Sequence, residues 1–169
     1  MNEPEELQRV AESLWSFLQT VGFVPGGEHA AWTGKVYSRS WTRGAGWKRD
    51  VVECHCRPKP SSVSLGASWM IPGPEDGDAV LVSAINSAHF FRGWPEYSVP
   101  VRLPMLGRFF EGRWLSHLLE DAKRSVQWLD ECASRPGALA ELERTDRNGP
   151  GRGTPIYQWV QRYIHDNAG

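Results

Sequence analysis

The strictest pattern in this chain is a two-residue alternation between positions 62 and 71. Apolar side chains occupy every second position, with serine or glycine between them: Val63, Leu65, Ala67, Trp69 and Ile71 against Ser62, Ser64, Gly66 and Ser68. Successive side chains of a strand point to opposite faces of a sheet. The alternation therefore predicts a strand with one buried apolar face and one face of small polar groups.

Three other segments share the composition of strands, being rich in β-branched and aromatic residues: Val36–Trp41, Lys48–Cys56 and Ala79–Ile85. Glycines and prolines stand between them, as turns require. Neighbouring strands that are joined by short turns pair antiparallel. We expect an antiparallel sheet of about four strands, with one face against helices and one more polar face.

Helical patterns flank these strands, because apolar residues recur there at three- and four-residue intervals. A first helix is predicted from Pro4 to Gly22, where glycine suits a left-handed end. Later helices are predicted at Arg113–Ala133, at Pro136–Leu142 and after Thr154, a good N-cap before Pro155. Helices before and after a block of strands are typical of an α+β fold, and 169 residues suit one domain over 1–169.

The segment His89–Arg108 contains three prolines among large aromatic and aliphatic residues. This composition predicts irregular structure, with one edge strand at Val99–Leu103. Tryptophan, tyrosine and arginine are enriched at binding hot spots, so we predict that Arg92, Trp94 and Tyr97 anchor a protein partner. The alternative is a long connection that is packed down by its own rings.

Composition and charge exclude several classes of protein. The net charge is -1, so the whole chain offers no bulk attraction to nucleic acid. Its apolar runs are too short to span a bilayer, and its acidic start does not fit a secretory signal. Three cysteines, an odd number, favour reduced thiols. We therefore expect a cytoplasmic protein that does not enter the membrane.

The triplet Cys54-His55-Cys56 contains only residue types that bind metals. On a strand, however, the two cysteines point to one side and His55 to the other. Zinc sites with paired cysteines also need a second pair, which the sequence lacks. We expect buried structural cysteines, no metal and no cofactor.

The alternation that buries Cys54 places Glu53, His55 and Arg57 together on the opposite face, where Arg39 and a serine of the next strand could join them. A carboxylate, an imidazole and guanidinium groups can bind a partner or an anion. In a small hydrolase or transferase, Glu53 and His55 could serve as acid and base. Polar outer faces of sheets also look like this without any function.

A second basic region is the segment from Trp32 to Lys59, where seven lysines and arginines are interleaved with Trp32, Trp41 and Trp47. Basic and aromatic groups together can bind single-stranded nucleic acid. This alternative is open, although the charge balance of the chain does not favour it.

Four short stretches carry a family resemblance: Gly22-Phe23, Tyr37–Trp41, Val51–Cys54 and Ser64–Gly66. They resemble a group of small uncharacterised bacterial α+β domains, some of which look like immunity proteins that neutralise toxins. The resemblance implies an α+β fold and a toxin-like protein partner, and it supplies no catalytic residues. We therefore predict a non-enzymatic protein-binding module whose contact residues are Arg39, Glu53, His55, Arg92, Trp94 and Tyr97.

Overall fold

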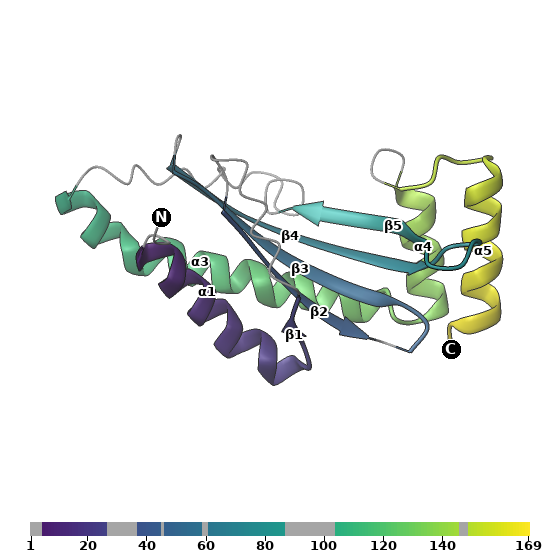
Figure 1. The fold of residues 1–169 in the computed structure, drawn as a ribbon, viewed down its shortest axis with the longest axis horizontal. Coiled ribbons are helices and arrows are strands. Elements are labelled where there is room, and N and C mark those ends of the chain that lie inside the picture. The colour runs from purple at the N-terminus through teal and green to yellow at the C-terminus, as the bar shows by residue number, and fades with distance from the viewer. Residues whose placement is uncertain (1–4, 27–36, 45, 59–60, 87–103, 146–148) are drawn as a thin grey trace.

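A computed structural model describes residues 5–26, 37–44, 46–58, 61–86, 104–145 and 149–169. Within these ranges the chain forms an antiparallel sheet that packs against helices from both ends of the sequence (Figure 1). The α+β architecture expected from the sequence is confirmed.

The sheet has five strands in the order β1-β2-β3-β4-β5, and every neighbouring pair is antiparallel. Four of them match the predicted strands to within a few residues at each end: β2 (Tyr37–Gly44), β3 (Arg49–Pro58), β4 (Ser61–Pro72) and β5 (Ala79–Asn86). The fifth, β1 (Val24–Pro25), pairs with Trp41 and Thr42 at the edge of the sheet. Two residues are too few to show an alternation, so the sequence did not indicate β1.

The helices are α1 (Glu5–Leu18), which continues into the short 3-10 helix η1 (Gln19–Val21), then α3 (Pro104–Glu131), α4 (Arg135–Arg144) and α5 (Pro155–Asn167). Gly22 ends the first of them with a φ of 87°, a left-handed conformation that glycine adopts without strain. Thr154 accepts a hydrogen bond from the backbone N–H of Tyr157, so the predicted N-cap of α5 is confirmed. None of the helices in the described ranges is long and apolar enough to cross a membrane.

The predicted start of α3 was wrong, because the helix begins at Pro104 and not at Arg113. Irregular structure was expected as far as Arg108. Proline suits the first turn of a helix, whereas Gly107 and neighbouring aromatic residues lower the helical propensity of the segment and mask its pattern. The edge strand predicted at Val99–Leu103 lies outside the described residues.

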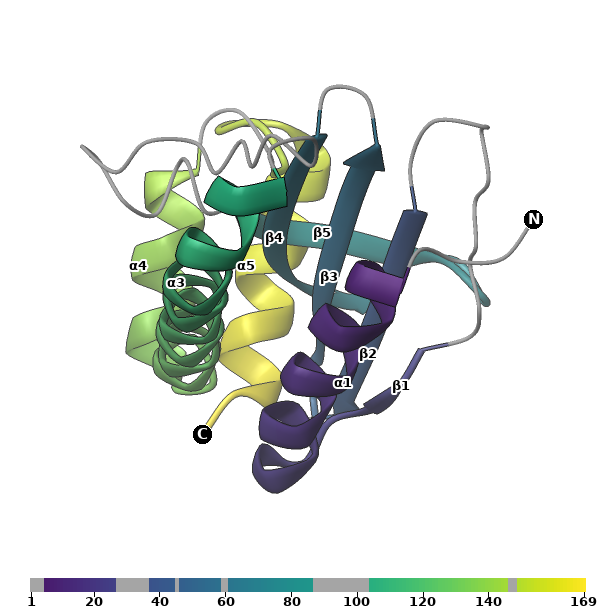
Figure 2. The ribbon, with the colours of Figure 1, turned by 90° about the vertical axis from the view of Figure 1, so that its left-hand side faces the viewer.

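Helices α1 and α3 pack against one face of the sheet, while α4 and α5 stand at the end where the β4–β5 turn lies (Figures 1 and 2). We call the face that α1 and α3 cover the inner face, and the opposite one the outer face. None of the helices in the described part of the chain packs on the outer face.

A continuous apolar core fills the inner face and reaches every helix. Trp69 of β4 is fully buried in it and meets the ring of Trp47 edge to face, with 5.7 Å between the ring centroids. The other core-facing residues of the alternating strand, Leu65, Ala67 and Ile71, are also buried. The two-faced strand expected from the alternation is therefore confirmed over its described side chains.

Candidate functional site

The strand register places six small or polar residues in two rows across the outer face. Ser38, His55 and Ser64 are directly opposite one another on β2, β3 and β4, and Ser40, Glu53 and Gly66 form the neighbouring row. We call these six residues the outer-face patch. Residues directly opposite in an antiparallel sheet have their Cβ atoms about 5 Å apart, so these side chains are close neighbours.

Glu53 and His55 project from a surface of much smaller groups. The side chain of Glu53 is 48% exposed and that of His55 is 36% exposed. Gly66, opposite Glu53, has no side chain, and a Cβ placed there would find its nearest neighbour, the carbonyl oxygen of Ile85, at 3.7 Å. Among the described residues, the packing therefore does not demand glycine at this position.

A line of polar contacts runs through the patch. Ser38 Oγ lies 2.8 Å from His55 Nδ1, and His55 Nε2 lies 3.4 Å from Glu53 Oε2. When the imidazole carries its proton on Nε2, the Ser38 hydroxyl donates to Nδ1 and Nε2–H faces the carboxylate. The patch thus presents a hydroxyl, an imidazole and a carboxylate in a fixed order.

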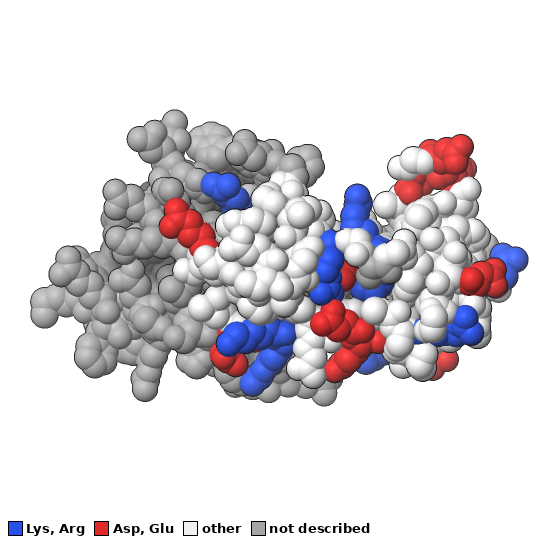
Figure 3. Space-filling view, turned by 90° about the horizontal axis from the view of Figure 1, so that it is seen from below, with Lys and Arg blue, Asp and Glu red and all other residues white. Residues whose placement is uncertain are grey.

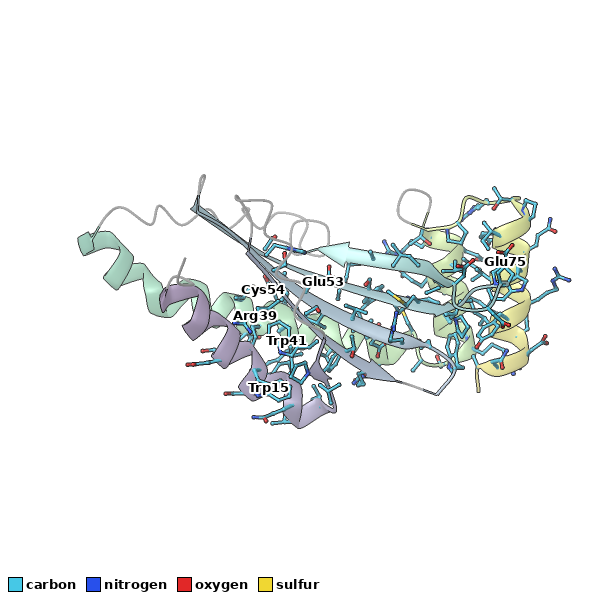
Figure 4. The ribbon with its side chains drawn as sticks, in the orientation of Figure 1. Trp15, Arg39, Trp41, Glu53, Cys54 and Glu75 are labelled. Atoms are coloured by element: carbon cyan, nitrogen blue, oxygen red, sulfur yellow. The ribbon has the colours of Figure 1, made fainter. Side chains whose placement is uncertain are left out.

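The prediction that Arg39 joins Glu53 and His55 on one face was wrong. Arg39 is opposite Cys54, and Cys54 is buried on the inner face. Figure 4 shows Arg39 beside Trp41 on the side of the sheet that α1 covers, near Trp15 of that helix. The side chain is half-buried there.

The physical reason is the alternation within β2 itself. Arg39 is two residues from Trp41, so the two side chains leave the strand on the same side, and Trp41 belongs to the core. Ser38 is the residue that this strand places beside His55. The sequence contained a signal for this arrangement, because an apolar tryptophan at position 41 indicates that Arg39 lies on the core side of the strand. The same alternation places Ser38 on the opposite side, with His55.

Other predicted site residues cannot be placed in the same way. Arg92, Trp94 and Tyr97 lie outside the described residues, and so does the side chain of Arg57. Their role in binding stays a prediction.

The cysteine and histidine of the triplet separate as predicted, with Cys54 buried on the inner face and His55 on the outer face. These two side chains therefore cannot bind one metal ion. No group of three or more metal-binding side chains with suitable geometry is found among the described residues.

An ionic cluster lies on the inner face where basic residues were considered for nucleic-acid binding. Lys48 and Asp50 are both buried and form an ion pair, and Lys48 also donates to the carbonyl oxygen of Leu129 at 3.0 Å. Arg43 bridges Asp50 at 2.8 Å and Asp130 of α3 at 2.6 Å. These basic groups are occupied by the protein's own acids and join the β2–β3 hairpin to α3.

The burial of Lys48 and Trp41 removes both from the basic and aromatic surface considered for nucleic acid. Figure 3 views the molecule from the helix side, and over its described part lysines and arginines lie beside aspartates and glutamates. The described residues of this face therefore offer nucleic acid no continuous basic surface.

Asp121 of α3 is a buried acid. It is 1% exposed, and neither carboxylate oxygen has a hydrogen-bond partner among the described residues. Burial raises the pKa of Asp121 to about 7. The charges of two neighbours have smaller effects: Arg124 lowers the pKa and Glu120 raises it. The group is in the core and not on the outer face, so it affects stability rather than the patch.

Comparison with known proteins adds no assignment, since the chain has no significant match to a family model, a curated protein or a solved structure.

Proposed function

We propose that this protein is a protein-binding module and that the outer face of its sheet is the contact surface. The observation that carries the proposal is the contrast between a helix-covered inner face and an outer face without a described helix layer, on which Glu53 and His55 project from small residues. A protein partner can approach the outer-face patch closely, because four of its six residues are serine or glycine and few long side chains must be displaced or ordered there.

The polar line through His55 supports a specific contact. The Ser38 hydroxyl and the Glu53 carboxylate hold the imidazole from two sides. Ordering these groups before binding reduces the entropy that binding must overcome. Standard interfaces bury about 800 Å² on each partner, more than the six-residue patch supplies, so neighbouring outer-face residues are part of the proposed surface.

The nature of the partner rests on the resemblance noted in the sequence. It supports a bacterial cytoplasmic protein that neutralises a toxin, with the partner held by the outer face and by Arg92, Trp94 and Tyr97. We retain these three as proposed second contacts. No nucleic acid, cofactor or metal is needed in this proposal.

The test is capture of partners from the native host by the tagged full chain, with identification by mass spectrometry. The variant E53A/H55A removes both projecting groups of the patch, whereas Q127A changes an exposed residue on the helix side. We expect a stoichiometric partner that is retained by Q127A and lost by E53A/H55A, with the unfolding temperatures of both unchanged. Retention of the partner by E53A/H55A would overturn the proposal.

The aromatic loop is tested separately by R92A/W94A in the same capture. Loss of the partner with this variant supports the second contact. Full retention removes the loop from the proposal and leaves the outer face as the binding surface.

A further inference from the structure

The outer-face patch lines up the three groups of an activated nucleophile. Ser38 Oγ is 2.8 Å from His55 Nδ1, within the reach of about 2.6–3.2 Å that proton transfer to a base requires. The other ring nitrogen faces the Glu53 carboxylate at 3.4 Å. A hydroxyl, a base and a third group that orients the base are the arrangement by which proteins activate serine.

We propose that Ser38 is a nucleophile for acyl transfer, with His55 as its general base and Glu53 as the positioning residue. The substrates are carboxylic esters and thioesters with good leaving groups. This inference goes beyond partner binding and does not depend on it.

Ser38 is selected by its geometry among several serines on the same face. Ser64 is also opposite His55, but from β4, and Ser40 is in the row of Glu53. Within the described part of the chain, the hydroxyl that hydrogen-bonds the imidazole is that of Ser38. We therefore expect modification at Ser38 and not at the neighbouring serines.

The exposure of the polar groups admits a substrate from the outer face. More than a third of the side chain of both His55 and Glu53 is exposed, and Gly66 leaves space beside them. Nothing described forms a deep enclosure around the three groups, so the site suits small acyl groups or an acyl group at the end of a flexible carrier.

The reaction proceeds in two balanced steps. The Ser38 hydroxyl gives its proton to His55 Nδ1 while Oγ forms a bond to the acyl carbon, and the leaving group departs with the proton from the imidazolium. Water then attacks the acyl-Ser38 ester, passes a proton to His55, and releases the carboxylic acid as Oγ regains a proton. The net reaction is hydrolysis: an ester gives a carboxylic acid and an alcohol, and a thioester gives a carboxylic acid and a thiol.

The leaving group determines which step is slow. An activated ester has a good leaving group and acylates Ser38 readily, whereas release of the acyl group must expel the poorer serine alkoxide. We expect acylation by activated esters, followed by slow release of the acyl group, so that acyl-Ser38 accumulates.

The experiment treats the full chain with p-nitrophenyl acetate and follows both p-nitrophenol release and the intact mass, with the acetylated residue located by peptide mapping. We expect a burst and one acetyl group per chain on Ser38. S38A should abolish this acetylation, and H55A should slow it by about a hundredfold or more. S68A, a serine of the same face in another row, is the matched control and should acetylate as the wild type does.

Rescue by a conservative variant tests the role of Glu53 in a way that separates it from a merely structural residue. E53A removes the carboxylate that faces Nε2 of His55, so acetylation of Ser38 should slow, whereas E53D keeps a carboxylate and should restore part of the rate. In H55A, the further change E53A should have no additional effect on the rate. Equal rates for the wild type and E53A would remove Glu53 from the proposal.

Two results would overturn the inference as a whole: no acetylation above that of an unfolded control, or equal acetylation of the wild type and S38A. Neither result affects partner capture, which uses no ester. Conversely, a failed capture leaves the acetylation of Ser38 unaffected, so the two proposals fail independently.

Discussion

The two faces of this sheet are built from alternate residues of the same strands, yet they differ in almost every physical respect. The inner face is filled by large apolar groups, among them the fully buried Trp69, and by a buried ionic cluster. The outer-face patch presents small residues and one polar line through His55. The comparison teaches that alternate residues of one strand can meet different requirements. One set of side chains builds the core, and the residues between them are available for a surface with a function.

The sharpest test of this comparison is to break the inner ionic cluster. In D50A, Lys48 stays buried without its carboxylate, and Arg43 loses one of its two acids. Breaking a buried ion pair from one side costs about 3–5 kcal/mol. We expect a loss of that size in the free energy of unfolding, measured by urea denaturation. A loss below about 1 kcal/mol would show that the cluster does not hold the hairpin to α3.

The buried carboxyl of Asp121 gives a pH dependence to the inner face. Because burial raises its pKa to about 7 from 3.8, the folded state favours the protonated form. The stability from Asp121 is therefore fully present below about pH 4 and is lost as the pH rises toward 7. D121N stays neutral and should be more stable than the wild type above pH 7, by roughly 1–3 kcal/mol.

The measurement for Asp121 is the urea midpoint of wild type and D121N from pH 4 to pH 8. D166N, a change at an exposed acid of α5, is the control and should run parallel to the wild type. Parallel curves for D121N and the wild type would contradict the expected ionisation.

Thiol labelling compares the accessibility of the two faces, and it needs only a substitution that should change the stability of the protein little. Burial, with a contribution from the charge of Glu141, raises the pKa of the Cys132 thiol to about 12. Cys132 should therefore resist a thiol reagent in the folded protein, whereas a cysteine introduced at exposed Ser64 should react in seconds to minutes. Labelling rates located by peptide mapping check this. Equal rates at positions 64 and 132 would mean that the inner face opens readily.

The smallest effect is expected for G66A on the outer face. Among the described residues, the added methyl group meets the carbonyl oxygen of Ile85 at 3.7 Å, an ordinary contact. We expect a change within about 0.5 kcal/mol in the free energy of unfolding. A loss above about 1 kcal/mol would show that the outer face is packed as demandingly as the inner one.

Local patterns were enough to predict much of the fold. The alternation at positions 62–71 assigned the two faces of β4, and Thr154 with Pro155 marked the start of α5. Both signals act through neighbours in the chain, which is why the sequence shows them. The start of α3 was missed because Gly107 and the aromatic residues near it have low helical propensity. Tertiary packing can override such a low propensity, and the local sequence does not show this.

The site was only partly predictable, because contacts across strands depend on register. Glu53 and His55 were recognised as neighbours since they are two residues apart on one strand. The partner of His55 was missed, since a shift of one residue exchanges Ser38 for Arg39. The burial of Lys48 was also hidden, because it depends on Asp50 and on a carbonyl group of α3, far away in the sequence.

The central claim is that the outer face binds a partner, and steric blocking tests it most directly. S64W places a large ring on the patch, whereas Q127W places the same ring on the exposed side of α3. Affinity for the captured partner is measured for both variants together with their unfolding temperatures. The account predicts loss of binding for S64W alone, with both proteins folded. Binding that survives in S64W, or is lost in Q127W, would contradict it.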